Sequence, residues 1–214
     1  MLAPSRTKHR TEDRQAELVQ AALQMAAQRS PSEITTGDLA QAIGITQGGV
    51  FKHFESKEAI WLAAIDWAHQ TLLARVQEAA SRPGAEGQPL QALREMFLAH
   101  VSFVQQYPGV PRLIFQELQH AHRSALKDKV QVLMSDYRQV LVRLLTRAQR
   151  DGQLSPQVDL ASAAVLFLGA VQGLVMQSMM TGTLKNMPGH ARSMFDLLEA
   201  GLRAPPKPLK GQPL

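Results

Sequence analysis

The chain has 214 residues and a formal net charge of +5, and it contains no cysteine. This length suits one large domain or two small ones with a substantial buried core. The lack of cysteine excludes disulfides, thiolate metal ligands and a cysteine nucleophile, and a reducing cytoplasm is consistent with it. Only 5% of the residues are aromatic, and apolar residues do not alternate with polar ones over any length, so strands are not expected.

The first elements in chain order are two helices. The N-terminal segment is polar and carries no apolar stretch typical of a secretory signal. In residues 11–29 the apolar residues recur at helical spacing, which predicts the first helix. Thr35 and Asp38 have the spacing of a capping box, which predicts the start of a short second helix. Gly44 is a good residue to end that helix.

A third short helix is predicted over 47–54, where Thr46 can cap its start, and Ser56 can cap a long fourth helix. Two short helices joined by a turn form the helix-turn-helix arrangement. Gly48 and Gly49 each cost about 1 kcal/mol of helix propensity. That loss is sensible if the helix must bring its backbone close to DNA bases. The alternative is a surface helix-loop-helix with two accidental glycines.

The clearest linker is residues 81–89, SRPGAEGQP. The most apolar stretch, residues 160–171, is about a dozen residues long, whereas a membrane span needs about 20. We therefore expect a buried helix there and no membrane association. The whole chain is predicted to be all-α, with nine helices and no internal repeat. The five helices after the linker are expected over residues 90–104, 112–121, 124–150, 158–180 and 190–202.

Residues 34–61, ITTGDLAQAIGITQGGVFKHFESKEAIW, resemble the N-terminal DNA-binding domain of the TetR family of repressors. The close match covers residues 12–65, and the rest of the chain matches only in helix count and spacing. Phe51 departs from the pattern, because the family usually has a tyrosine there whose hydroxyl reaches a phosphate. We expect Phe51 to pack or to contact a thymine methyl group. The shared features are Thr35, Gly44-Ile45-Thr46, Gly48, Phe51-Lys52-His53-Phe54 and Lys57-Glu58.

The resemblance implies a cytoplasmic regulator, usually a repressor, that binds double-stranded operator DNA. It implies a homodimer on a near-palindromic operator, which is released when a small-molecule effector enters the C-terminal domain. Phosphate contacts position such a protein, whereas base contacts specify the sequence. The implied phosphate contacts are Thr35, Thr46, His53 and Lys57, and the residues implied to face base edges are Gln47, Gly48, Gly49 and Lys52.

Three segments follow from this interpretation. Residues 1–56 are predicted to form the DNA-binding domain, and residues 57–203 the ligand-binding and dimerisation domain, with the fourth helix as the connection. Much of the positive charge lies in the Pro-rich C-terminal end, which carries Arg203, Lys207 and Lys210. Residues 204–214 are predicted to be a disordered tail.

The eighth predicted helix is apolar around most of its circumference, so more than one of its faces must be covered. The ninth helix carries one apolar stripe. Pairing both helices with their copies in a two-fold four-helix bundle would bury these surfaces. The alternative is one monomer core that absorbs them all. The predicted dimer interface consists of Leu168, Gly169, Gly173, Met176, Met194, Leu197 and Leu198.

An apolar lining with a few polar groups is what a small-molecule cavity requires, although the same residues would serve an ordinary core. Arg138 is the predicted charge partner for an anionic or carbonyl-bearing effector. The predicted effector pocket consists of Phe97, His100, Val101, Val104, Tyr107, Phe115, Met134, Tyr137, Arg138, Leu141, Phe167, Gln172 and Met176.

The sequence carries no Gly-x-Ser-x-Gly, His-Glu-x-x-His, P-loop or dinucleotide fingerprint, so neither an enzyme nor a cofactor is predicted. A metal site built from His100, His120 and His122 is the alternative to ordinary polar histidines, and we predict no metal. The alternative function is a helical ligand- or partner-binding module with weak or lost DNA binding.

Overall fold

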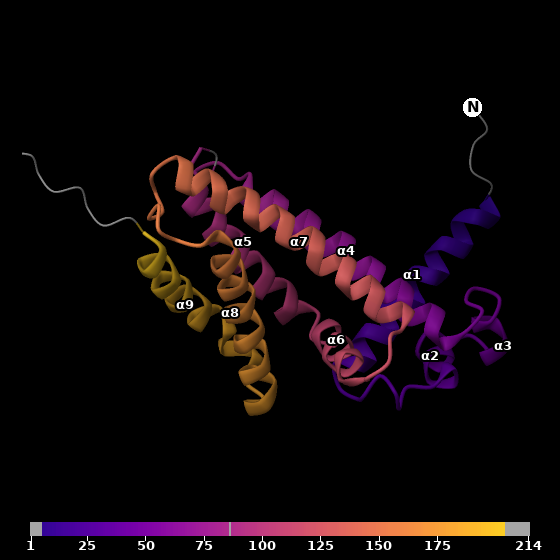
Figure 1. Ribbon diagram of the computed structural model, residues 1–214. Helices are drawn as coiled ribbons and strands as arrows, with labels where there is room; N and C mark the ends of the chain where they lie inside the picture. Colours follow the sequence, from indigo (N-terminus) through magenta and orange to yellow (C-terminus); the bar gives the residue numbers. More distant parts are fainter. Residues whose placement is uncertain (1–5, 86, 204–214) are drawn as a thin grey trace, which may run out of the picture. The chain divides into compact units, whose positions relative to one another are not determined.

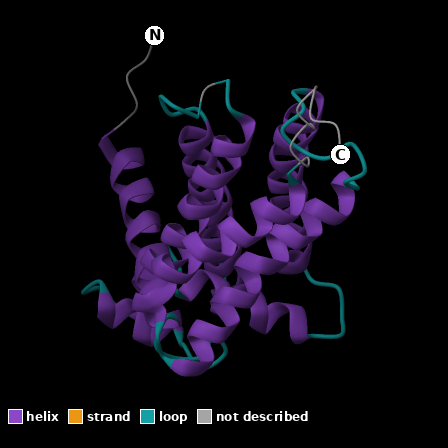
Figure 2. Ribbon diagram, turned by 90° about the vertical axis from the view of Figure 1, so that its left-hand side faces the viewer, coloured by secondary structure: helices purple, strands orange, loops and turns teal. Residues whose placement is uncertain are grey.

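A computed structural model of the protein describes residues 6–85 and 87–203, which form nine α-helices, one 3-10 turn and no strand (Figure 1, Figure 2). The all-α prediction is confirmed. The helices are α1 (Arg6–Ala26), α2 (Thr36–Ala42), α3 (Gln47–Val50), α4 (Lys57–Ala80), α5 (Pro89–Gln106), α6 (Gly109–Gln119), α7 (Ala125–Arg150), α8 (Leu160–Thr181) and α9 (Met187–Leu202).

Two helices begin three residues earlier than the sequence predicts. Helix α6 starts at Gly109 and α9 at Met187. Pro111 and Pro188 are residues that can break a helix, but each lies in the first turn of its helix. A first-turn proline is tolerated because its missing N–H has no partner inside the helix in any case.

Helix α3 is shorter than predicted, because it ends at Val50 rather than at residue 54. Beyond Val50, the amide of Lys52 donates to the carbonyl of Gly49 at 3.3 Å and that of His53 to Val50 at 2.9 Å. These two bonds span three residues, and one four-residue bond follows, from the Phe54 amide to the carbonyl of Val50 at 3.0 Å, so the chain continues as turns. A segment that contains two glycines favours this outcome.

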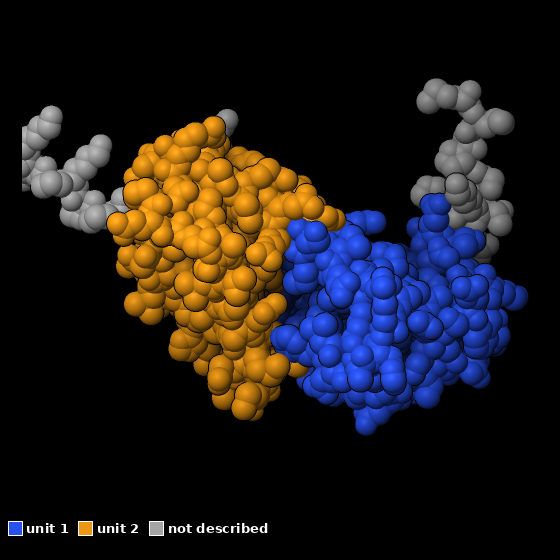
Figure 3. Space-filling view, in the orientation of Figure 1, with its two compact units in different colours: residues 1–73, 103–135 blue, residues 74–102, 136–214 orange. Residues whose placement is uncertain are grey.

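Contacts between residues divide the chain into two compact units (Figure 3). Residues 1–73 and 103–135 form unit 1, and residues 74–102 and 136–214 form unit 2. Helices α4, α5 and α7 contribute residues to both units, so this division does not follow the predicted boundary after residue 56. That boundary stays a prediction, and the predicted tail, residues 204–214, lies outside the described residues.

In unit 1, α1 packs against α2 and α6, and α2 packs against α3. The contact between α1 and α6 is unusually close at Gly109. A β-carbon built there would lie 2.0 Å from the carbonyl oxygen of Leu23, so only glycine fits. Nearby, the Ser30 hydroxyl donates to the Gln116 side chain at 2.7 Å. These contacts attach the helix-turn-helix segment to α6.

The core of unit 2 is built around three aromatic rings. The ring of Phe97 lies 5.2 Å from that of Phe167 and 5.6 Å from that of Phe195, measured between centroids. These residues come from α5, α8 and α9 respectively, so their packing joins the three helices. Edge-to-face pairs of this kind add to the burial of the rings themselves.

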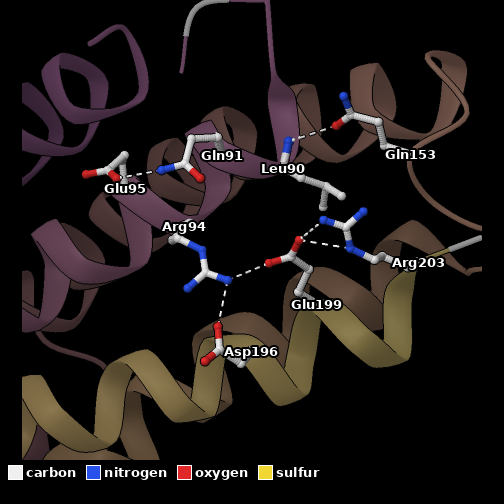
Figure 4. Close-up of polar contacts among 8 residues, drawn as sticks. All are labelled: Leu90, Gln91, Arg94, Glu95, Gln153, Asp196, Glu199 and Arg203. Carbon is white, nitrogen blue, oxygen red and sulfur yellow. Dashed lines mark hydrogen bonds and ion pairs between the residues drawn. The ribbon is translucent and has the colours of Figure 1, made fainter. Parts of the chain in front are cut away.

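A network of charges holds α9 to α5 (Figure 4). The Arg94 guanidinium lies 2.6 Å from the Asp196 carboxylate and 2.7 Å from that of Glu199. Glu199 is buried and also accepts hydrogen bonds from Arg203. A buried carboxylate needs such partners. The network covers one side of α9, while the neighbouring Leu197 lies on the exposed side.

Helix α8 is long and apolar enough to cross a membrane by length and composition alone, but core helices of soluble proteins pass the same test. Only 33% of the apolar 18-residue stretch within this helix is buried in the described part of the chain. Within a single chain, one face of this helix is therefore not buried. That face carries exposed large side chains, namely Val165, Leu166, Met176 and Met180.

Candidate nucleic-acid interface

The first helix of the helix-turn-helix begins with the predicted capping box. The Thr35 hydroxyl oxygen accepts from the Asp38 amide at 3.1 Å, and the Asp38 carboxylate accepts from the Thr35 amide at 2.8 Å. The Asp38 carboxylate also accepts from the Thr35 hydroxyl at 2.9 Å, and the bonds from the Thr35 amide and hydroxyl hold the pKa of Asp38 below its usual range. Gly44 follows the helix with a φ of +70°, a conformation that favours glycine, as predicted. The start of α2 and the turn after it are thus set by local contacts.

The two glycines of α3 have different surroundings. Thr46 caps the helix, because its hydroxyl oxygen accepts from the Gly49 amide at 3.1 Å. A β-carbon on Gly49 would lie 3.3 Å from that oxygen, so the cap itself favours a small residue there. A β-carbon on Gly48 would meet no protein atom within 4 Å. Internal packing therefore gives a reason for Gly49 and none for Gly48.

Five predicted contact residues form an exposed surface on α3 and the turn after it. Phe51 is 51% exposed, although it is a large apolar side chain. An exposed aromatic beside polar groups agrees with contact to a partner rather than with packing in the core. The exposed residues are Thr46, Gln47, Gly48, Phe51 and Lys52, and Thr35 is also exposed at the start of α2.

His53 is half-buried, and its two ring nitrogens differ. The Nδ1 atom is buried and has no hydrogen-bond partner among the described residues. The carbonyl of His53 accepts from the Gln15 side chain at 2.9 Å, which fixes this turn against α1. The predicted phosphate contact of the His53 ring stays a prediction.

Lys57 has a structural role that the sequence did not reveal. Its ammonium group donates to the carbonyl oxygens of Ser32 at 3.1 Å and Ile34 at 2.9 Å. The first residue of α4 therefore holds the loop that precedes α2. An ammonium group has three protons, so one remains for the predicted phosphate contact. Backbone carbonyls leave no signal in a sequence, which is why these partners were missed.

Thr36 makes a contact with Gln47 that sequence reasoning missed. The Gln47 side-chain amide donates to the Thr36 hydroxyl oxygen at 2.9 Å. This bond joins the first residue of α3 to the first residue of α2. The two residues are 11 positions apart, and no periodicity connects them, so only the folded turn brings them together.

The predicted effector residues separate into buried and exposed groups. In unit 2, the buried His100 and Tyr137 share a hydrogen bond of 3.1 Å. Burial lowers the pKa of His100 to about 4 and raises that of Tyr137, so both are neutral near pH 7. The other buried residues are Phe97, Val101, Val104, Leu141 and Phe167, the half-buried ones Tyr107, Phe115 and Met134, and the exposed ones Arg138, Gln172 and Met176.

Gln172 and Met176 lie on the exposed face of α8, opposite the buried Phe167 and Leu174. The unit 2 core that surrounds His100 therefore does not include them. Arg138 likewise faces solvent. Among the residues that the structure describes, no group of three or more His, Asp or Glu side chains is placed to hold a metal ion.

The predicted dimer residues mostly lie on exposed faces of α8 and α9. Leu197 is 76% exposed and Met176 is 42% exposed. Leu198 instead packs inside its own chain, because it lies on the side of α9 that faces the unit 2 core. The exposed residues of the set are Gly169, Gly173, Met176 and Leu197, and the half-buried ones are Leu168 and Met194.

Two family profiles match the sequence. The family described as "Bacterial regulatory proteins, tetR family" matches residues 18–64, and the one described as "Tetracyclin repressor-like, C-terminal domain" matches residues 114–195. The probable acrEF/envCD operon repressor of Escherichia coli K12 is 24% identical over 188 residues, which cover 86% of this chain and 82% of that protein. These matches include both the helix-turn-helix and the C-terminal helices.

Solved structures show the same fold. The ketosteroid transcriptional regulator KstR2 of Mycobacterium tuberculosis has a TM-score of 0.74 and 20% identity, with 90% of this chain and 96% of that chain covered. The transcriptional regulator FadR of Bacillus subtilis, solved in complex with stearoyl-CoA, has a TM-score of 0.73 and 17% identity, with 88% and 99% covered.

Proposed function

Because the chain belongs to the TetR family of bacterial regulatory proteins, we propose that it is a ligand-responsive transcriptional repressor. In this proposal it acts in the cytoplasm, binds a near-palindromic operator as a dimer, and leaves the DNA when a small molecule binds. In this proposal the protein binds DNA and a small molecule and does not catalyse a reaction.

The observation that carries the proposal is the exposed surface of α3. Gly48 has open space where a side chain would stand, and its neighbours Gln47 and Lys52 are exposed polar residues. Glycine costs helix stability, and no contact within the described protein accounts for it here. Close approach of a DNA major groove does account for it, because any β-carbon at this position would hold the helix away from the bases.

Dimerisation is supported by the exposed apolar faces of α8 and α9. Large contiguous apolar patches on a single chain mark interaction sites. Helices α8 and α9 pack against each other, so their outer faces together offer a two-helix surface. Gly169 and Gly173 have open space on that surface, which allows another helix to approach closely. A second copy of the chain supplies a matching surface.

The proposed effector site is the core of unit 2. His100 and Tyr137 are a neutral polar pair among apolar side chains, and this is the composition of a small-molecule site. The FadR relative was solved with stearoyl-CoA, which supports ligand binding in this fold. To release DNA, the effector must bind the DNA-incompetent state more tightly. About 2.7 kcal/mol of differential affinity changes operator binding roughly a hundredfold.

Binding to the DNA upstream of the protein's own gene tests the proposal. We expect a gel shift with this DNA at concentrations that leave unrelated DNA unshifted, and a smaller difference between the two DNAs in Gln47→Ala. Equal binding of both DNAs by the dimeric protein would contradict sequence-specific recognition. No binding to either DNA would favour a helical module that binds a ligand or partner instead.

A further inference from the structure

The bond between Gln47 and Thr36 restricts which base Gln47 can read. The Gln47 Nε2 atom donates to the Thr36 hydroxyl oxygen at 2.9 Å. Gln47 is exposed, so without this bond its long side chain would be free to adopt many rotamers. The bond instead favours one orientation of the amide before any DNA is bound.

A side-chain amide has two N–H donors and one carbonyl oxygen acceptor. Thr36 uses one of the donors. When the N–H on the Cγ side of the amide donates to Thr36, the other N–H and the Oε1 atom lie side by side and form a donor beside an acceptor. Adenine presents the complementary pair in the major groove, because its N7 accepts and its N6 amino group donates.

Guanine presents two acceptors, N7 and O6, in the same place. A free glutamine can turn both of its N–H groups toward them. Gln47 cannot do so while it donates to Thr36, and its Oε1 would then face a guanine acceptor. The hydrogen bond therefore favours adenine and disfavours guanine at the base pair that Gln47 meets.

The neighbouring positions leave this contact unobstructed. Gly48 follows Gln47, and Gly37 follows Thr36, so neither helix carries a competing side chain at the next residue. A β-carbon at Gly48 would meet no protein atom within 4 Å. The side-chain amide of Gln47 is thus the group that can contact a base at this place on the surface of α2 and α3.

We propose that Thr36 is a positioning residue that orients Gln47 to read adenine, so that each operator half-site carries an A·T pair at the position that Gln47 contacts. The inference rests on the proposed DNA-binding function. It adds the identity of one base and a role for a residue outside the recognition helix.

The test begins with selection of bound duplexes from a randomised DNA library by the full-length protein. The affinity of each variant is then measured by fluorescence anisotropy on a selected duplex and on versions with each base pair changed in turn. For the wild type, we expect replacement of A·T by G·C at one position per half-site to weaken binding roughly 5- to 100-fold. Gln47→Ala should abolish the discrimination at that position alone.

Thr36→Val removes the hydroxyl and keeps the shape, so it should reduce the preference for A·T over G·C at the same position. Thr36→Ser keeps the hydroxyl and should retain the preference. Thr36→Ala gives a second variant without the hydroxyl. Loss of a phosphate contact by Thr36 would weaken all duplexes equally, so it would not change the base preference.

Selection of no common sequence would overturn both the inference and the proposed function. Two other results would overturn the inference alone. One is that the operator position whose base preference is lost in Gln47→Ala prefers a base pair other than A·T. The other is an unchanged preference for A·T in folded Thr36→Val and Thr36→Ala.

Discussion

Gly48 is the residue that tests the proposed close approach to DNA, because nothing in the described protein occupies the space where its side chain would be. We predict that Gly48→Ala weakens operator binding at least tenfold, since the β-carbon would meet the DNA. The same change should leave folding unimpaired or stabilise it by up to about 1 kcal/mol through helix propensity. Anisotropy on a selected duplex and urea unfolding measure the two effects, and unchanged operator affinity would contradict close approach.

Lys57 combines a structural contact with a proposed phosphate contact. We predict that Lys57→Ala lowers the free energy of unfolding by about 1–2 kcal/mol, because the carbonyls of Ser32 and Ile34 lose a charged donor. The slope of log affinity against log salt should also fall by about 0.9. Lys52→Ala is the matched control, since exposed Lys52 should affect DNA affinity without affecting stability. An unchanged salt slope in Lys57→Ala would limit Lys57 to its structural role.

His100 gives the stability of the protein a pH dependence. Burial lowers its pKa to about 4 from 6.5, so the unfolded state takes up the proton first as the pH falls. The stability that it contributes is present above pH 6.5 and is lost between pH 6.5 and 4. We predict a loss of about 2 kcal/mol between pH 7 and pH 5. Urea unfolding at both pH values should show a smaller loss in His100→Gln, and an equal loss in both proteins would be evidence against this assignment.

Some residue contacts were predictable from the sequence and others were not. The capping of α2 by Thr35 and its end at Gly44 depend on residues a few positions apart, so the sequence predicted them. The bonds of Lys57 to backbone carbonyls depend on how the chain folds back across 23 and 25 positions. Which side chains face DNA follows from the family resemblance and stays a prediction.

At the scale of elements, the contact between α1 and α6 depends on one glycine. A β-carbon on Gly109 would lie 2.0 Å from the Leu23 carbonyl oxygen, so α6 would have to move away from α1. We predict that Gly109→Ala lowers the free energy of unfolding by about 1–3 kcal/mol. Gly189→Ala is the control, because Gly189 is exposed at the start of α9 and has open space around it. Equal stability of the two variants would show that the helices do not need this close contact.

The number and order of the helices were predictable because apolar periodicity and caps are local signals. Their boundaries were less so, since Pro111 and Pro188 are compatible with a first turn as well as with a break. The exposed face of α8 was not distinguishable from its buried face, because both are apolar in the sequence. Exposure depends on which helices pack against it, and that is a property of the fold.

At the scale of the whole molecule, the proposed dimer depends on Leu197 and the exposed face of α8. We predict that Leu197→Glu weakens self-association at least tenfold, because a carboxylate would be buried without a partner in the interface. Leu118→Glu is the matched control, since Leu118 is 55% exposed on α6, outside the proposed interface. Light scattering across a range of concentrations compares the two variants, and equal dimer stability would place the interface elsewhere.

In the proposed function, two copies of the chain read two halves of one operator. The most direct measurement is the mass, by light scattering, of the complex between the full-length protein and a selected duplex, together with its affinity when one half-site is scrambled. We predict two chains per duplex and a loss of most of the sequence-specific affinity after scrambling. A single bound chain whose affinity does not depend on the second half-site would contradict the account.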